Sequence, residues 1–172
     1  MRHHFDHHLN VKDLILTYGS RHLVELGALE GHNTLQFLKL REEYPFHLVT
    51  ISDGTIEDAF GEVRELDGQR DFKWVQGKSY DELKKFPDRW IDFCSIDTEH
   101  TSECLTKELD ALLPKLFPQC IVVFHDTNSF PELRDVILDF VKQNPPFAVI
   151  RETIESAGAM AIGRNLPIGF FE

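Results

Sequence analysis

The stretch that decides the fold reads WIDFCSIDTEH at residues 90–100 and, after a helical segment, CIVVFHDTN at residues 120–128. Two apolar runs, residues 91–96 and 120–124, each end abruptly in acidic and imidazole side chains. Runs of this length, rich in β-branched and aromatic residues, are typical of strands buried on both faces. The residues between them place leucines on one face of a helix. These are Leu105, Leu109, Leu112, Leu113 and Leu116.

Strand, helix and strand in such a short stretch form a βαβ crossover, so the two strands are predicted to be parallel and close together. Adjacent strands lie about 4.8 Å apart. Asp97 and Asp126, which follow the two runs, would then meet at one carboxyl edge. Open α/β sheets bind their ligands at this edge, and we predict the functional site there.

The composition describes a single globular domain. The chain has 172 residues, of which 42% are hydrophobic and 27% charged. Its formal charge of −11 argues against a nucleic-acid partner. No apolar run approaches the roughly 20 residues of a membrane span, and no signal-peptide pattern is present, so we expect a cytoplasmic protein without a membrane partner. The cysteines lack paired spacing and are predicted to be reduced, buried thiols.

The remaining chain continues the alternation of strands and helices. Residues 1–10 hold four histidines and are predicted to be a His-rich tail or a tag, and residues 11–172 a single domain. Further strands are predicted at residues 22–26, 46–51 and 72–75, and a closing hairpin at residues 147–154 and 159–164. Thr55 and Asp58 are predicted to cap one helix, and Ser129 and Glu132 to form a capping box at another. Five β-α units and a hairpin predict one doubly wound α/β domain.

A glycine turn, ELGALEGHNT at residues 25–34, joins the first strand to its helix. Gly27 and Gly31 allow a tight turn and close approach of a ligand to the backbone. The spacing is not G-x-G-x-x-G, which disfavours a dinucleotide and, with it, another nucleotide-dependent α/β enzyme.

Together these segments resemble the class I S-adenosylmethionine-dependent methyltransferases, closest to the small-molecule O-methyltransferase group that includes macrolide-sugar and cephalosporin-pathway enzymes. The glycine turn is similar to the family's cofactor loop, IDFCSIDTEH to its I-D-x-x-x-I-D-G-D-H segment, and VVFHDT to its strand-five ending. The resemblance spans residues 21–164. It implies a mostly parallel seven-stranded sheet of order 3-2-1-4-5-7-6, with the last strand antiparallel and helices on both faces.

The resemblance also implies which residues bind S-adenosylmethionine. The glycine turn would face its methionine part, the end of the second strand its ribose, and the end of the third strand its adenine. The family's ribose acid is expected at Ser52, whereas the acid here, Asp53, falls one residue later. Lys78 stands where the family often has an acid. The implied cofactor-binding residues are Glu25, Gly27, Gly31, Ser52, Asp53, Gly77, Ser79 and Asp97.

The same resemblance implies that Asp97 and Asp126 bind a divalent cation, Mg²⁺ or Mn²⁺, with His125 beside them and His100 as the general base. Such a cation can orient a hydroxyl and lower its pKa. Successive strand residues point to opposite faces, so His125 and Asp126 both face the site only if the strand has already turned. An acid that merely precedes a helix, and a surface histidine, are the alternatives for Asp97 and His100.

The function implied is a divalent-metal-assisted O-methyltransferase acting on a hydroxyl of a small molecule or sugar. The alternative is a non-catalytic S-adenosylmethionine-binding module that acts through a protein partner. It is motivated by the displaced Asp53 and by the short chain, which leaves little beyond the core for a substrate lid. Acceptor pockets are built from variable loops, so the acceptor stays open, as does the oligomeric state, homo-oligomers included.

Overall fold

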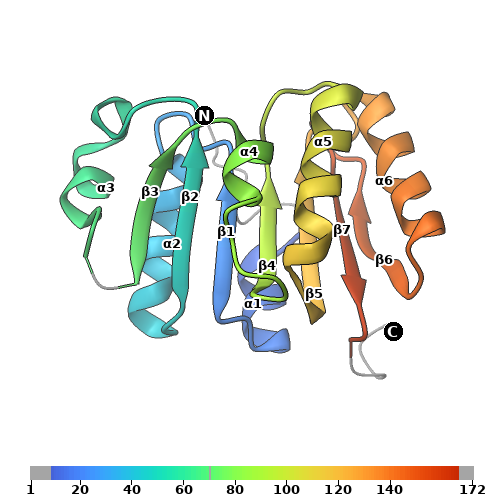
Figure 1. The fold of residues 1–172 in the computed structure, drawn as a ribbon, viewed down its shortest axis with the longest axis horizontal. Coiled ribbons are helices and arrows are strands. Elements are labelled where there is room, and N and C mark those ends of the chain that lie inside the picture. The colour runs from blue at the N-terminus through green and yellow to red at the C-terminus, as the bar shows by residue number, and fades with distance from the viewer. Residues whose placement is uncertain (1–8, 70, 167–172) are drawn as a thin grey trace.

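The computed structural model describes residues 9–69 and 71–166, and in them seven strands form one sheet of order β3-β2-β1-β4-β5-β7-β6 (Figure 1). Neighbouring strands are parallel except at β7, which is antiparallel to both β5 and β6. The strand order and directions that the family resemblance implied are therefore confirmed. The strands are β1 (His22–Leu26), β2 (His47–Ser52), β3 (Phe72–Gln76), β4 (Ile91–Ile96), β5 (Leu116–His125), β6 (Phe147–Thr153) and β7 (Ala159–Arg164).

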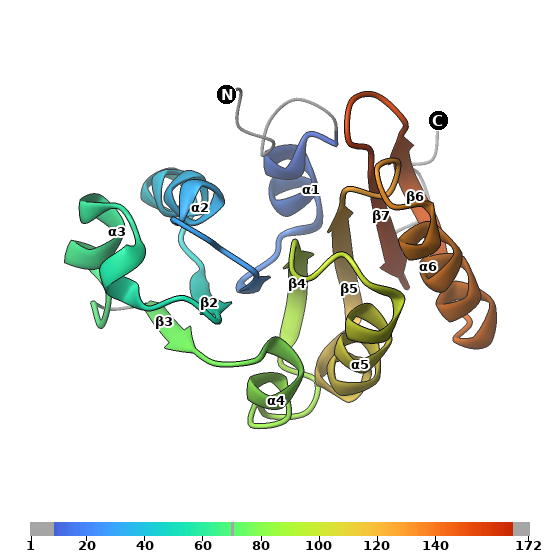
Figure 2. The same ribbon diagram turned by 90° about the horizontal axis from the view of Figure 1, so that it is seen from above.

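Helices cover both faces of the sheet, as Figure 2 shows from above. One face carries α1 (Val11–Tyr18), α2 (His32–Glu43) and α3 (Gly61–Leu66). The other carries α4 (Ser79–Leu83), α5 (Ser102–Leu112) and α6 (Pro131–Gln143). Two short 3-10 helices, η1 (Ile56–Asp58) and η2 (Leu113–Lys115), complete the set. Among the described residues, no helix has the length and apolar character needed to cross a bilayer.

The core consists of two apolar layers, one on each side of the sheet. Phe93 and Ile121 belong to the layer beneath α1 and α2, whereas the next residues along each strand, Cys94 and Val122, belong to the opposite layer. All four are fully buried. Burial on both faces explains why β4 and β5 are uninterrupted apolar runs rather than alternating patterns. The three cysteines are free and buried, as predicted.

The structure corrects three local predictions. Leu116 does not continue the helical face of α5 but opens β5, because Pro114 lies in η2 and cannot supply the N–H that a continuing α-helix needs. The Ser129–Glu132 capping box does not form. Instead α6 begins at Pro131, with Phe130 at its N-cap position. The segment after Thr55 divides into η1 and α3, and the predicted capping by Thr55 and Asp58 is confirmed, since the Thr55 N–H donates to the Asp58 carboxylate at 3.1 Å.

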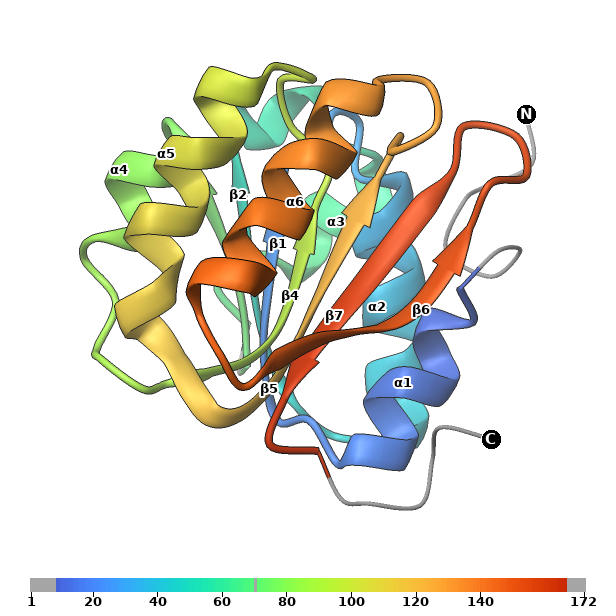
Figure 3. The same ribbon diagram turned by 90° about the vertical axis from the view of Figure 1, so that its right-hand side faces the viewer.

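The predicted His-rich tail falls mainly on residues 1–8, which lie outside the described residues. The two that follow belong to the folded part, since Leu9 is buried and the side chain of Asn10 caps α1. At the other end of the domain, β6 and β7 form the predicted hairpin along one edge of the sheet (Figure 3). Its turn lies beside the loop that follows β5, where Asn128 and Ser129 donate backbone hydrogen bonds to the carbonyl of Ala157.

Candidate functional site

The carboxyl ends of β1 and β4 meet at the glycine turn. Gly27 has a φ of 81°, and a Cβ at this position would lie 1.9 Å from the backbone carbonyl oxygen of Asp97. The backbone N–H of Asp97 in turn donates to the carbonyl of Leu26 at 2.9 Å. Only glycine therefore fits, for reasons of both backbone angle and space. The close approach that the sequence predicted is made here by the protein's own backbone.

A pocket of about 220 Å³ opens beside this junction. Six of the residues predicted to bind the cofactor line it, and two, Glu25 and Gly31, do not. The pocket therefore lies at the switch point of the sheet, where β1 is flanked by β2 on one side and β4 on the other. The six lining residues are Gly27, Ser52, Asp53, Gly77, Ser79 and Asp97.

The rim of the pocket is charged. The Asp53 side chain is 73% exposed, and its carboxylate lies 3.9 Å from the ammonium of Lys78. Lys78 pairs more closely with Glu99, at 2.7 Å. The hydrogen bond and charge of this pair raise the pKa of Lys78 and lower that of Glu99. Ser52, the family's expected ribose position, is instead buried, and its hydroxyl accepts from the Gly54 N–H at 3.2 Å.

Glu25 lies behind the pocket, with 1% of its surface exposed. One carboxylate oxygen accepts from the hydroxyls of Thr34 and Thr50 at 2.6 and 2.8 Å, while the other, Oε1, has no hydrogen-bond partner. Burial raises the pKa of this carboxyl to about 7, against the opposing effect of the two hydroxyls. Its predicted role toward the methionine part of the cofactor stays a prediction.

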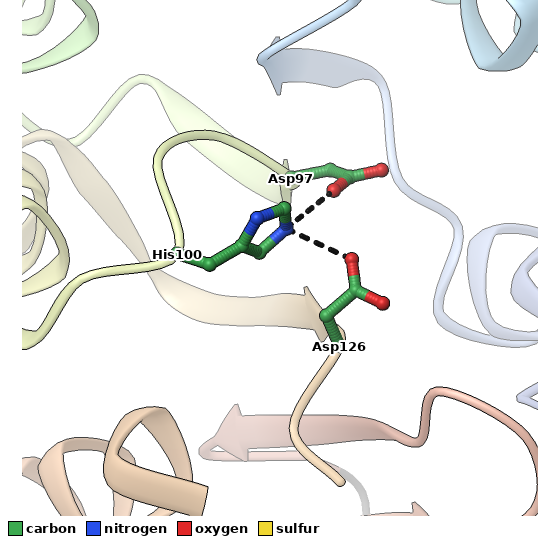
Figure 4. Close-up of side chains that lie close together, drawn as sticks. All are labelled: Asp97, His100 and Asp126. Atoms are coloured by element: carbon green, nitrogen blue, oxygen red, sulfur yellow. Dashed lines mark ion pairs between the residues drawn. The ribbon is translucent and has the colours of Figure 1, made fainter. Parts of the chain in front are cut away.

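Asp97, His100 and Asp126 converge at the ends of β4 and β5 (Figure 4). Nε2 of His100 lies 2.8 Å from Oδ2 of Asp126 and 3.4 Å from Oδ1 of Asp97. This nitrogen is buried yet makes no hydrogen bond of regular geometry, so the short distances reflect proximity rather than a donated bond. Among the described residues, this is the one group of three or more such side chains whose ligand atoms lie within 4.8 Å of one another.

Local backbone and ring contacts hold this cluster in place. Asp126 adopts a left-handed φ of 59°, which turns the chain directly after β5. The Phe130 ring stacks on the His100 imidazole, with centroids 4.6 Å apart and planes 5° from parallel. His125, the last residue of β5, is buried and lies outside the cluster. The structure thus brings His100, rather than His125, to the two acids, and the roles of all three stay predictions.

Comparison with known proteins fits this geometry. Residues 24–127 match the family described as a methyltransferase domain. The chain belongs to this family. No curated protein matches the sequence of this methyltransferase domain.

Solved structures share the fold of the methyltransferase domain at low sequence identity. A Staphylococcus aureus protein assigned as a caffeoyl-CoA O-methyltransferase has a TM-score of 0.72 and 17% identity over 90% of this chain and 81% of that one. The O-methyltransferase NovP has a TM-score of 0.67 and 16% identity over 89% and 76%. PaMTH1 from Podospora anserina, bound to S-adenosylhomocysteine, has a TM-score of 0.66 and 13% identity over 88% and 74%. The fold is that of class I S-adenosylmethionine-dependent methyltransferases.

The sequence reasoning missed Glu108, which stands behind the wall of this pocket. Glu108 is completely buried in α5 and accepts hydrogen bonds from Ser79 and Thr98, both of which line the pocket. A signal was present, because Glu108 falls between Leu105 and Leu109 on the apolar stripe of the helix. Burying an acid in such a stripe is costly unless its oxygens are hydrogen-bonded, so its position predicts hydrogen-bond partners nearby.

Proposed function

We propose that the protein is an S-adenosylmethionine-dependent O-methyltransferase that uses a divalent cation to act on a hydroxyl of a small molecule or sugar. The observation that carries the proposal is the convergence of two carboxylates and one imidazole nitrogen beside the pocket. Two carboxylates this close repel each other unless a cation or a proton lies between them. The family membership supports methyl transfer, and the cluster supports the metal.

The residues present fit both expected groups. The pocket lies beside the glycine turn, and the exposed carboxylate of Asp53 at its rim would be the group that accepts from the hydroxyls of a ribose. Asp97 and Asp126 supply the oxygen ligands that Mg²⁺ and Mn²⁺ accept. Bound there, the cation would orient the acceptor hydroxyl and make it more acidic.

His100 is proposed as the general base. Its Nε2 faces the space between the two carboxylates, where the acceptor hydroxyl would also lie. During methyl transfer from S-adenosylmethionine, the acceptor hydroxyl would give its proton to Nε2 of His100. Stacking on Phe130 restricts the ring and keeps Nε2 directed at the site.

Calorimetric titration with S-adenosylhomocysteine and, separately, with Mn²⁺ tests the proposal. Asp126→Asn should weaken Mn²⁺ binding tenfold or more, about 1.4 kcal/mol, and leave S-adenosylhomocysteine affinity nearly intact. Asp139→Asn, which makes the same change on the exposed side of α6, is the control and should alter neither. His100→Ala should retain Mn²⁺ affinity and slow methyl transfer by roughly 10²- to 10⁴-fold.

A different result would refute each part of the proposal: the general base, the metal and the cofactor site. Loss of Mn²⁺ affinity in His100→Ala as large as in Asp126→Asn would make His100 a ligand rather than the base. Binding of S-adenosylhomocysteine without any binding of Mn²⁺ or Mg²⁺ would favour the non-catalytic binding module. Absence of S-adenosylhomocysteine binding would refute the cofactor site itself.

A further inference from the structure

Glu108 is a buried acid without a cationic partner among the groups that shift its pKa. None of its surface is exposed, and burial raises the pKa of its carboxyl, which hydrogen bonds from Ser79, Thr98 and Cys104 oppose. Burying an acid is costly unless its oxygens are hydrogen-bonded. Here both oxygens are used, because Oε1 accepts from the Ser79 hydroxyl and Oε2 from the Thr98 hydroxyl, the latter at 3.0 Å.

Its partners come from different elements of the pocket wall. Ser79 begins α4, Thr98 lies in the loop between β4 and α5, and Cys104 lies in the first turn of α5. All three line the pocket, whereas Glu108 stands behind them. A single carboxylate therefore ties together the side of the pocket formed by α4 and α5. With Thr98 bound to its second oxygen, the carboxylate cannot rotate away from Ser79.

These bonds decide what the wall can offer a ligand. A hydroxyl has one proton, and once that proton is donated, its oxygen can only accept from a third group. The Ser79 proton is committed to Glu108, so Ser79 presents an acceptor to the pocket. The transferred methyl group must approach the acid cluster at Asp97 and His100. The resemblance to the methyltransferase family implies that the adenine of the cofactor lies at the end of β3, beside the pocket-lining residues Gly77 and Ser79.

We propose that Glu108 is a positioning residue that fixes the Ser79 hydroxyl as a hydrogen-bond acceptor, so that the pocket selects an aminopurine over an oxopurine. This inference rests on the proposed cofactor site. The exocyclic amino group of adenine is a donor and matches such an acceptor. A carbonyl oxygen at the same position of the base would meet another acceptor, which leaves both without a proton to share.

Glutamine at position 108 reverses this arrangement. Its amide has nearly the shape of the carboxylate, but its nitrogen donates. If the amide nitrogen donates to Ser79, the serine proton becomes free to point into the pocket. The wall then accepts an oxopurine as readily as an aminopurine. A residue that only held the fold together would change the affinity for both ligands alike.

The experiment compares S-adenosylhomocysteine with its deaminated analogue, S-inosylhomocysteine, by calorimetry. The natural protein should bind the amino form about tenfold more tightly or better, and Glu108→Gln should reduce that ratio to about threefold or less. Glu103→Gln makes the same change on the exposed side of α5, where Glu103 pairs with Lys107, and should keep the full ratio. Thermal unfolding confirms that each variant is folded.

Several results would overturn the inference. One is an unchanged ratio in folded Glu108→Gln, and another is the absence of any preference in the natural protein. If Glu108→Gln does not fold, Ser79→Ala decides, since it removes the acceptor and leaves Glu108 bound to Thr98. A ratio that falls in Ser79→Ala supports the inference, and one that persists refutes it. If the natural protein binds neither ligand, the proposed cofactor site fails together with this inference, whereas equal binding of both defeats the inference alone.

Discussion

Replacing Glu25 by glutamine should change how the stability of the protein depends on pH. The Glu25 carboxyl is buried beneath the glycine turn, where Thr34 and Thr50 donate to one oxygen and the other oxygen has no hydrogen-bond partner. No cation is among the groups that shift its pKa, and the nearby charge of Asp97 raises that pKa further. The charged form is therefore disfavoured in the folded protein and favoured in the unfolded chain, where water surrounds it.

The sign and size follow from the two pKa values. Folding raises the pKa of Glu25 from 4.5 to about 7, so between these values the folded protein holds a proton that the unfolded chain releases. The contribution of Glu25 to stability is thus complete below pH 4.5 and is lost as the pH rises through 7. Between pH 5 and pH 8 this single group should lower the free energy of unfolding by about 2.5 kcal/mol. Glutamine cannot ionise and removes the effect.

Urea denaturation at pH 5, 6, 7 and 8, followed by circular dichroism, measures this difference. The natural protein should lose about 2.5 kcal/mol more than Glu25→Gln across the series, whatever constant offset the substitution introduces. Glu30→Gln, in the turn before α2 and with a side chain that is 67% exposed, is the matched control and should follow the natural protein. Parallel curves for the natural protein and Glu25→Gln would show that Glu25 is charged in the fold, and would refute the reasoning.

Three further substitutions test how the site is built. Gly27→Ala should destabilise the protein and abolish S-adenosylhomocysteine binding in calorimetry, because its Cβ would lie 1.9 Å from the Asp97 carbonyl oxygen; a folded variant with full affinity would contradict this. Gly158→Ala should weaken Mn²⁺ binding, since a Cβ there would lie 2.4 Å from Cβ of Asn128 and displace the Asp126 loop; unchanged Mn²⁺ affinity would show that the hairpin does not support the loop. Asp53→Ala should weaken S-adenosylhomocysteine binding about tenfold if the displaced acid reaches the ribose, and a smaller loss would leave the ribose without this contact.

The fold could be read from the sequence because strand burial leaves a strong pattern. β1 and β4 begin and end where predicted, since apolar runs bounded by turn residues have few alternative readings. Errors arose where two patterns compete. Leu116 continues the leucine spacing of α5. The proline two residues before it nevertheless prevents the helix from continuing, and Leu116 begins β5. The spacing of the leucines alone does not show that the proline lacks the backbone N–H that a continuing helix needs.

Only part of the site could be predicted. The sequence does not show in which direction the chain turns after a strand ends. Asp97 and Asp126 could be placed together from the βαβ rule alone. Which of the two histidines, His100 or His125, joins these acids could not be predicted. It depends on the left-handed turn at Asp126 and on the stacking of the Phe130 ring on His100. Non-glycine residues rarely adopt a positive φ, so the local sequence does not predict this turn at Asp126.

Two buried glutamates, Glu25 in β1 and Glu108 in α5, differ in whether their hydrogen-bond partners line the pocket. Glu25 accepts from Thr34 and Thr50, neither of which lines the pocket. Replacing Glu25 should therefore change the free energy of unfolding rather than the choice of ligand. Glu108 accepts from hydroxyls that line the pocket, so in the proposed cofactor site its hydrogen bonds would act on the ligand. Glu25→Gln should therefore leave the preference for S-adenosylhomocysteine over S-inosylhomocysteine unchanged, while Glu108→Gln removes it. Equal effects of the two substitutions on that ratio would mean that a buried acid acts here through general stability, not through the hydroxyls that it orients.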